Sequence, residues 1–262
     1  MSYETSGTPS GPCPPRRPPR RLVAGVAAGL GLIALNRHLV ASASAGADDP
    51  AATREGAGTD TGTGAHGVRE TLPGTGRRLA LTFDDGPHPA YTREILAVLR
   101  AHGVRATFFV AGENAEWQPA LLRAIADEGH LIGNHTWSHP RLDRLPPADA
   151  RDELARTSDA VARAVGTPPV LVRAPYGAWS ADTLRAAREL GMAPLGWSLD
   201  TDDWARPGTT AISRTLLDGA RPGAIVLAHD GGGDRTQTVA ALGYCLPRLL
   251  DRGYALVLPP TG

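Results

Sequence analysis

The chain has no lysine, only two cysteines, and aromatic side chains at just 5% of its 262 positions. Its 27 basic residues are therefore all arginines, and 27 acidic residues balance them, so charge gives no reason to expect nucleic acid or an anionic membrane as a partner. Cys13 and Cys245 stand near opposite ends, which excludes a disulfide framework, and we expect Cys245 to be a buried core thiol. The longest apolar run, residues 22–35, falls short of the roughly 20 residues that span a bilayer.

The N-terminal segment has the order of parts typical of an export signal. Arginines at 16, 17, 20 and 21 precede the apolar run, and the small residues 41–45 follow it. Arg37 and His38 interrupt this order, so an uncleaved signal anchor stays open beside a cleaved signal. We expect residues 1–45 to direct the protein out of the cell or into the cell envelope. We expect contact with the membrane only if this segment stays in place as an anchor.

The rest of the chain divides into a linker and one domain. Residues 46–77 are rich in Gly and Thr and lack apolar periodicity, which predicts a flexible linker. Residues 78–262 should fold as a single monomeric domain. Near its end, residues 230–235 are glycine-rich without the Lys-Ser/Thr ending of a phosphate loop, and we expect a flexible turn there.

Short apolar segments alternate with amphipathic segments throughout this domain. The expected strands are 79–83, 106–110, 131–133, 170–172, 193–199, 224–228 and 255–258. The expected helices are 92–101, 120–128, 147–165, 180–190, 210–218 and 238–251. The alternation predicts an α/β fold with a parallel sheet, either open or closed into a barrel. Ligands in such folds bind at the carboxyl ends of the strands.

Two groups of side chains near expected strand ends suggest metal chemistry. Asp84 and Asp85 leave the first strand into a Gly-Pro turn, and neighbouring side chains on an extended segment point in opposite directions, which predicts two separate roles. His135 and His139 can converge from one helical turn or from a tight loop. Two imidazoles and a carboxylate leave a coordination position open, as in catalytic zinc sites, although cobalt, nickel or iron also accept such ligands.

Five short motifs occur in order: Thr82–Pro87, His135–Pro140, Arg173–Gly177, Asp200–Trp204 and Leu227–His229. In this the chain resembles the polysaccharide deacetylases with a NodB homology domain, carbohydrate esterase family 4, over about residues 78–258. The resemblance implies a distorted (β/α) barrel with fewer than eight repeats. It also implies hydrolysis of acetyl groups on a glycan with a divalent metal, Zn2+ first and Co2+ or another transition metal as alternatives.

The resemblance assigns the base and the metal ligands. Asp84 corresponds to the general base that activates the attacking water. Arg173 corresponds to the residue that orients the base, and a guanidinium suits this role because it can grip a carboxylate bidentately. Asp85, His135 and His139 correspond to the metal triad.

The remaining assignments concern the acid and the substrate. His229 corresponds to the general acid, and we expect Asp203 to be its partner carboxylate, with Asp200 as the alternative. The backbone N–H of Tyr176 corresponds to a donor to the oxyanion. Two side chains are implied as walls of the acetyl pocket: Trp204 and Leu227.

The substrate class leaves alternatives open. The leading expectation is an N-acetyl group on an aminosugar of peptidoglycan or a chitin-type glycan, and an export signal favours a cell-envelope substrate. O-acetylated xylan would use the same carbonyl chemistry. A carbohydrate-binding protein without turnover should have lost the base, a ligand or the acid, whereas all are present. A glycosidase would use paired carboxylates but has no role for the histidine pair.

Overall fold

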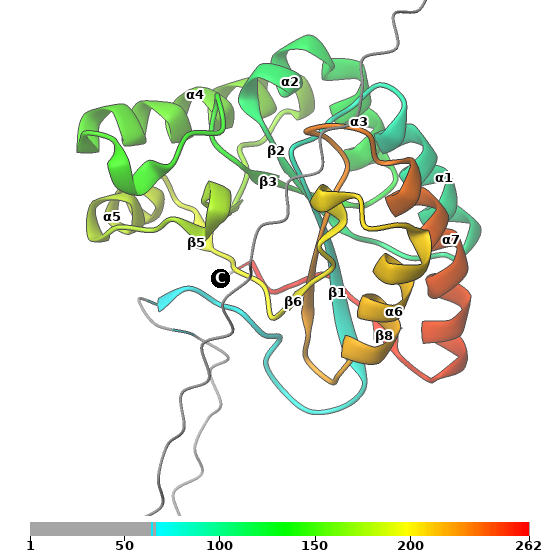
Figure 1. Cartoon of the computed structure of the whole chain (residues 1–262). Coiled ribbons are helices and arrows are strands. Elements are labelled where there is room, and N and C mark those ends of the chain that lie inside the picture. Colours follow the sequence, from blue (N-terminus) through cyan, green and yellow to red (C-terminus); the bar gives the residue numbers. More distant parts are fainter. Residues whose placement is uncertain (1–63, 65–66, 262) are drawn as a thin grey trace, which may run out of the picture. The chain divides into compact units, whose positions relative to one another are not determined.

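The computed structural model describes residues 64 and 67–261 (Figure 1). The export signal expected over residues 1–45 and most of the expected linker lie outside the described residues. Within the described part of the chain, no helix is long and apolar enough to cross a membrane.

The domain is built on a curled parallel sheet. Its strands are β1 (Arg78–Asp84), β2 (Thr107–Val110), β3 (Leu131–Asn134), β4 (Leu171–Val172), β5 (Ala193–Pro194), β6 (Leu199–Asp200), β7 (Ile225–His229) and β8 (Ala255–Leu256). Their order is β5-β4-β3-β2-β1-β7-β6, and β8 pairs with the start of β1. The curled half-barrel confirms the predicted distorted barrel with fewer than eight repeats.

Helices cover the outside of the sheet (Figure 1). They are α1 (Tyr91–Ala101), α2 (Gly112–Trp117), α3 (Pro119–Asp127), α4 (Pro147–Val165), α5 (Ala181–Glu189), α6 (Thr209–Gly219) and α7 (Thr236–Asp251). Ser180 is the N-cap of α5 and forms a capping box with Thr183. The sequence did not predict α2, because its six residues are too few to show an apolar period.

Alternation along β1 decides which side chains reach the inside of the barrel. Leu79, Leu81 and Phe83 pack in the cluster between sheet and helices, whereas Ala80 packs in the interior cluster. Because strand side chains alternate between faces, Asp84 shares the interior side with Ala80. Cys245 is buried in the outer cluster, as predicted. The central strands β1, β2 and β7 are buried on both faces, as is usual in parallel sheets.

The strand predicted over residues 193–199 is wrong in one respect. The structure divides it into β5 and β6, which are the two opposite edges of the sheet. The residues between them carry the chain from one edge to the other. The carbonyls of Leu195 and Gly196 accept hydrogen bonds from Arg173 at 3.3 and 2.7 Å, so this segment binds a side chain where a strand was expected.

The folded domain also begins before Arg78, which corrects the linker boundary. Val68 and Leu72 are buried, although they lie in the segment expected to be flexible. Arg69 pairs with Leu195 and Thr71 with Ala224 in isolated bridges. Residues 67–72 therefore belong to the packed domain, where they add apolar contacts that a short run without periodicity does not reveal.

Candidate active site

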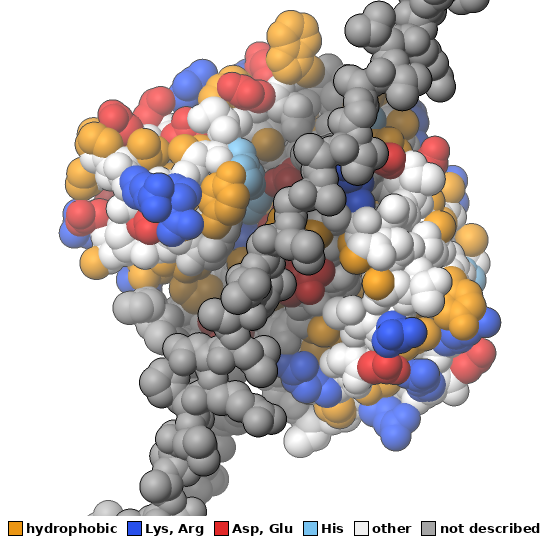
Figure 2. Space-filling view, viewed as in Figure 1, with side chains coloured by type: hydrophobic (Ala, Val, Ile, Leu, Met, Phe, Trp, Pro, Cys, Tyr) orange, Lys and Arg blue, Asp and Glu red, His pale blue; other side chains and the backbone are white. Residues whose placement is uncertain are grey.

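The carboxyl ends of the strands surround a cavity of about 760 Å³, a size suited to a small ligand. Asp84 and His229 are register partners on the adjacent strands β1 and β7, so the first and fifth motifs meet directly. Every predicted site residue lines this cavity except Arg173 and Asp203, which are buried behind it. Figure 2 shows acidic and histidine side chains gathered in the central hollow of this face.

Asp85, His135 and His139 converge on one point. Their ligand atoms lie within 4.8 Å of one another. Asp85 Oδ1 is 3.4 Å from His135 Nε2 and 3.1 Å from His139 Nε2, and it is buried without a hydrogen-bond partner. His135 Nδ1 lies 2.8 Å from the Arg173 carbonyl, which can only accept, so the proton sits on Nδ1 and Nε2 is left as a metal ligand. An orphaned carboxylate oxygen and imidazole nitrogens fit a divalent cation.

Left-handed backbone brings these ligands together. Asp85, Thr136 and His139 have φ angles of 72°, 69° and 60°, a conformation that costs non-glycine residues energy and clusters at functional sites. The two histidines therefore converge from a tight loop, which settles the choice that their spacing left open. Such a loop needs support from its surroundings.

Glu153 of α4 supplies that support and was missed from the sequence. Its Oε2 accepts the backbone N–H groups of Trp137 and Ser138 at 2.8 Å each, and its Oε1 accepts the Ser138 hydroxyl at 2.9 Å. The His139 N–H donates to Thr136 Oγ1 at 3.1 Å. One carboxylate thus fixes the backbone between the two histidine ligands. Nothing in the spacing of a helical glutamate signals this role.

Asp84 is held by Arg173, although not in the expected bidentate grip. Arg173 Nη1 donates to Asp84 Oδ1 at 2.8 Å and lies 2.7 Å from Thr82 Oγ1, while Nε and Nη2 donate to the carbonyls between β5 and β6. Both side chains are almost fully buried. The guanidinium also lies over the rings of Phe109 and Trp197. Because all three guanidinium nitrogens of Arg173 make hydrogen bonds, the side chain is fixed and orients one Asp84 oxygen.

His229 is paired with Asp203, and Asp200 is not its partner. His229 Nδ1 donates to Asp203 Oδ1 at 2.7 Å, and the His229 N–H donates to Oδ2 at 2.9 Å. Thr238 completes the carboxylate's bonds at 2.7 Å. Burial by itself would lower the pKa of His229, but the hydrogen bond and charge of Asp203 outweigh it and raise that pKa to about 9. Asp200 instead accepts the Asp202 N–H at 2.9 Å.

Replacing Asp203 should move the alkaline limit of activity. A histidine that donates a proton must be protonated, so activity falls as pH rises through its pKa, about 9 in the intact pair. In Asp203→Asn, the loss of the negative charge should let the pKa fall toward 6.5 or below. The alkaline limb of the kcat/KM profile should therefore shift to lower pH by about one unit or more, the size of pKa change that the loss of a charged partner causes.

Asp200→Asn is the matched control for this experiment. It also removes a carboxylate at the cavity wall, but one that makes no bond to His229. Its alkaline limb should stay where the wild type has it. Equal shifts in the two variants would show that general field effects, and not the Asp203 pair, set the protonation of His229.

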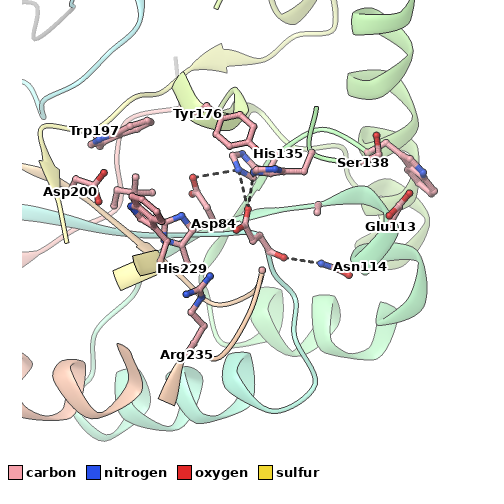
Figure 3. A pocket seen from close by; sticks show the side chains of 17 residues that line it. Asp84, Glu113, Asn114, His135, Ser138, Tyr176, Trp197, Asp200, His229 and Arg235 are labelled. Carbon is pink, nitrogen blue, oxygen red and sulfur yellow. Dashed lines mark hydrogen bonds and ion pairs between the residues drawn. The ribbon is translucent and has the colours of Figure 1, made fainter. Parts of the chain in front are cut away.

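The remaining predicted residues form the rim of the cavity. Tyr176 has a φ of 61°, and its ring is 64% exposed and packs edge-on against His139 at 4.9 Å between centroids. Leu227 is buried in the wall, whereas Trp204 is 58% exposed at the mouth. Trp137 and Trp197 also line the cavity, although the motifs did not single them out. Figure 3 shows Trp197, Tyr176 and His135 along one side and His229 opposite.

The glycine-rich segment after His229 is tightly packed, which corrects the expectation of a flexible turn. A Cβ at Gly231 would lie 2.1 Å from the Asp85 carbonyl oxygen, and one at Gly232 would lie 2.4 Å from Asp85 Oδ2. Close approach to the metal-ligand turn therefore requires glycine here. Arg235 closes the segment by donating from Nε to the Gly231 carbonyl at 2.7 Å.

Asp230 is the first residue of this segment, and the sequence assigned it no role. It is fully buried, and Thr92 donates to its Oδ2 at 2.5 Å. Burial raises the pKa of Asp230 to about 7; the Thr92 bond opposes this rise, and the negative charges of Asp85 and Asp84 add to it. Its backbone N–H donates to the Asp84 carbonyl at 3.0 Å, so β7 is tied to the turn that carries the first motif.

Comparison with known proteins agrees with this geometry. Residues 72–195 match the polysaccharide deacetylase family. A chitooligosaccharide deacetylase of a Bradyrhizobium species (strain ANU 289) is 44% identical over 69% of this chain and 88% of its own. A peptidoglycan-N-acetylglucosamine deacetylase of Bacillus cereus is 39% identical over 70% of this chain and 67% of its own.

A solved structure is similar as well. The crystal structure of the Bc1960 peptidoglycan N-acetylglucosamine deacetylase is 38% identical with a TM-score of 0.70, covering 72% of this chain and 89% of that one. Shared fold, ordered motifs and sequence identity lead to one conclusion. The chain belongs to the polysaccharide deacetylase family.

Proposed function

We propose that this protein is a metal-dependent hydrolase that removes N-acetyl groups from aminosugar glycans of the chitin or peptidoglycan type. One observation carries the proposal. A buried carboxylate held by an arginine and a histidine held by a carboxylate are register partners on adjacent strands, and both line the cavity that contains the Asp85, His135 and His139 group. We assign Asp84 as the base and His229 as the acid of one reacting centre; both side chains are labelled in Figure 3.

The residues act in a defined order. Asp84 accepts a proton from the attacking water, whose oxygen forms a bond to the acetyl carbon. The Tyr176 backbone N–H donates to the developing oxyanion. His229, charged at neutral pH because of Asp203, then gives its proton to the sugar nitrogen as the carbon–nitrogen bond breaks. The products are acetate and a free amine.

Asp85, His135 and His139 would hold the metal. A divalent cation bound there supplies Lewis-acid polarisation of the carbonyl and lowers the pKa of water. We propose Zn2+ because two imidazoles and a carboxylate match its catalytic sites, with Co2+ as the second choice. The protein's own part is to fix the ligands, through Glu153 and the Arg173 carbonyl.

Aromatic side chains favour a sugar as substrate. Trp137, Trp197, Trp204 and Tyr176 stand around the cavity, and such rings can pack against the apolar face of a pyranose. The similarity to a chitooligosaccharide deacetylase and to peptidoglycan deacetylases supports an aminosugar over acetylated xylan. We further propose that residues 1–45 export the protein, cleaved or as an anchor, so that it meets a cell-envelope glycan.

Acetate release is the test. The purified protein should release acetate from chitin oligomers or peptidoglycan at a higher kcat/KM than from acetylated xylan. A chelator should abolish this release, and added Zn2+ or Co2+ should restore it. Full activity in excess chelator would contradict the metal mechanism, and acetate release from xylan alone would contradict the aminosugar substrate.

A further inference from the structure

Trp117 has the highest exposed fraction, 80%, among the large hydrophobic side chains of the described residues. The chain contains only five tryptophans, and three of them, Trp137, Trp197 and Trp204, line the cavity. An indole left in water forgoes the stabilisation that its burial would give. Trp117 belongs to α2, and other residues of this helix line the same cavity.

The orientation of α2 is fixed by contacts on one side. Ala115 is buried, and a Cβ on Gly112 would meet Trp137 and Thr157 at 2.4 and 2.5 Å, so these two residues face inward. Glu116, next to them around the helix, pairs with Arg163 of α4 at 2.6 Å. The opposite side of α2 must therefore face away from α4.

That opposite side faces the cavity. Glu113 and Asn114 line it, and Asn114 Nδ2 donates to the carbonyl of Asp85 at 2.8 Å, as Figure 3 shows. At 3.6 residues per turn, Trp117 lies between Glu113 and Asn114 around the helix and about one turn, roughly 5 Å, further along it. Helical side chains lean toward the N-terminus, so the indole leans back toward the cavity.

We propose that Trp117 is a stacking platform for a sugar of the glycan chain beyond the residue that is deacetylated. The proposal rests on the proposed function, because the occupant is a further unit of the same polymer. The site and Trp117 form one continuous face along α2, and the distance of one helical turn is comparable to the length that one sugar adds to a chain. An exposed indole offers an apolar plane to the C–H face of a pyranose, and Glu113 beside it offers a carboxylate to the hydroxyls.

The dependence of activity on the length of the glycan substrate tests whether Trp117 binds a sugar. The kcat/KM for acetate release should be measured on N-acetylglucosamine, which has no neighbouring sugar, and on chitohexaose, with the intact protein and with Trp117→Ala. The ratio of hexamer to monomer should fall about 2- to 10-fold in Trp117→Ala, the range expected for one aromatic contact. Trp117→Phe keeps a ring and should recover most of the ratio.

Tyr244→Ala is the matched control, since Tyr244 is an exposed aromatic residue of α7 that does not line the cavity. Its hexamer-to-monomer ratio should equal that of the wild type. An unchanged ratio in Trp117→Ala would overturn the proposal, and so would an equal loss on both substrates, which would mark Trp117 as structural.

A second measurement separates this proposal from the proposed function. The affinity for chitohexaose, measured by calorimetry with a chelator present so that no turnover occurs, should also fall about 2- to 10-fold in Trp117→Ala. If the wild type released no acetate from any glycan, the proposed function would fail, and this affinity would still decide whether Trp117 binds sugar. Equal affinities in the two proteins would overturn the platform.

Discussion

Asp84→Asn should lower kcat/KM for acetate release by about 10²- to 10⁴-fold, the contribution of a positioned general base. The substitution keeps the size of the side chain and an oxygen that can accept from Arg173, so the local packing should survive. It removes only the group that can take a proton. Acetate release at neutral pH, with saturating Zn2+, is the direct measurement.

Metal content distinguishes this loss from a collapse of the site. Asp84 lies 3.6 Å from His135 Nε2 but does not belong to the ligand group, so Asp84→Asn should still bind one equivalent of metal. His135→Ala is the matched comparison, because it should lose metal and activity together. Activity within tenfold of the wild type in Asp84→Asn would remove the base assignment.

Arg173→Met should lower the free energy of unfolding by about 3–5 kcal/mol, because it leaves a buried carboxylate without its partner. Asp84 is almost fully buried and loses its 2.8 Å hydrogen bond, and the carbonyls of Leu195 and Gly196 lose theirs. Activity should fall as well, since nothing then orients the base. Urea unfolding followed by far-ultraviolet circular dichroism measures the first effect and acetate release the second.

The double variant tests whether the unpaired charge is the cause. Adding Asp84→Asn to Arg173→Met removes the buried charge and should restore part of the lost stability. The double variant should then lose less unfolding free energy than the sum of the two single variants. Arg185→Met, at an exposed pair with Asp182, should cost little in comparison. If Arg173→Met were no less stable than Arg185→Met, the buried pair would not support the fold.

Much of the site could be predicted because its residues stand at the ends of strands. Period-2 and period-3.6 patterns located most strands and helices, and a parallel sheet brings the carboxyl ends of its strands together. Short motifs with fixed spacing then identified Asp84, Asp85, His135, His139 and His229. The resemblance carried by these motifs assigned their roles, and the structure brings all five to one cavity.

Other features depend on contacts between distant segments. Glu153 and Asp230 are ordinary acidic residues in the sequence, and only the fold places them against the ligand loop and the β1 turn. Whether Asp203 or Asp200 meets His229 is decided by a three-residue difference in a turn with left-handed backbone at Asp202. Residues 193–199 are divided between two edges, and the segment between them accepts hydrogen bonds from Arg173, which is 22 residues away from Leu195.

The crossing from β5 to β6 links assembly of the protein to its activity. Arg173 is the side chain that fastens this crossing and also the one that aims Asp84. A molecule in which Arg173 has not yet bound this segment therefore has no oriented base. Incompletely folded copies would therefore be inactive toward any acetylated glycan that they meet. Orientation of the base is thus coupled to folding of the segment between the two edges of the sheet.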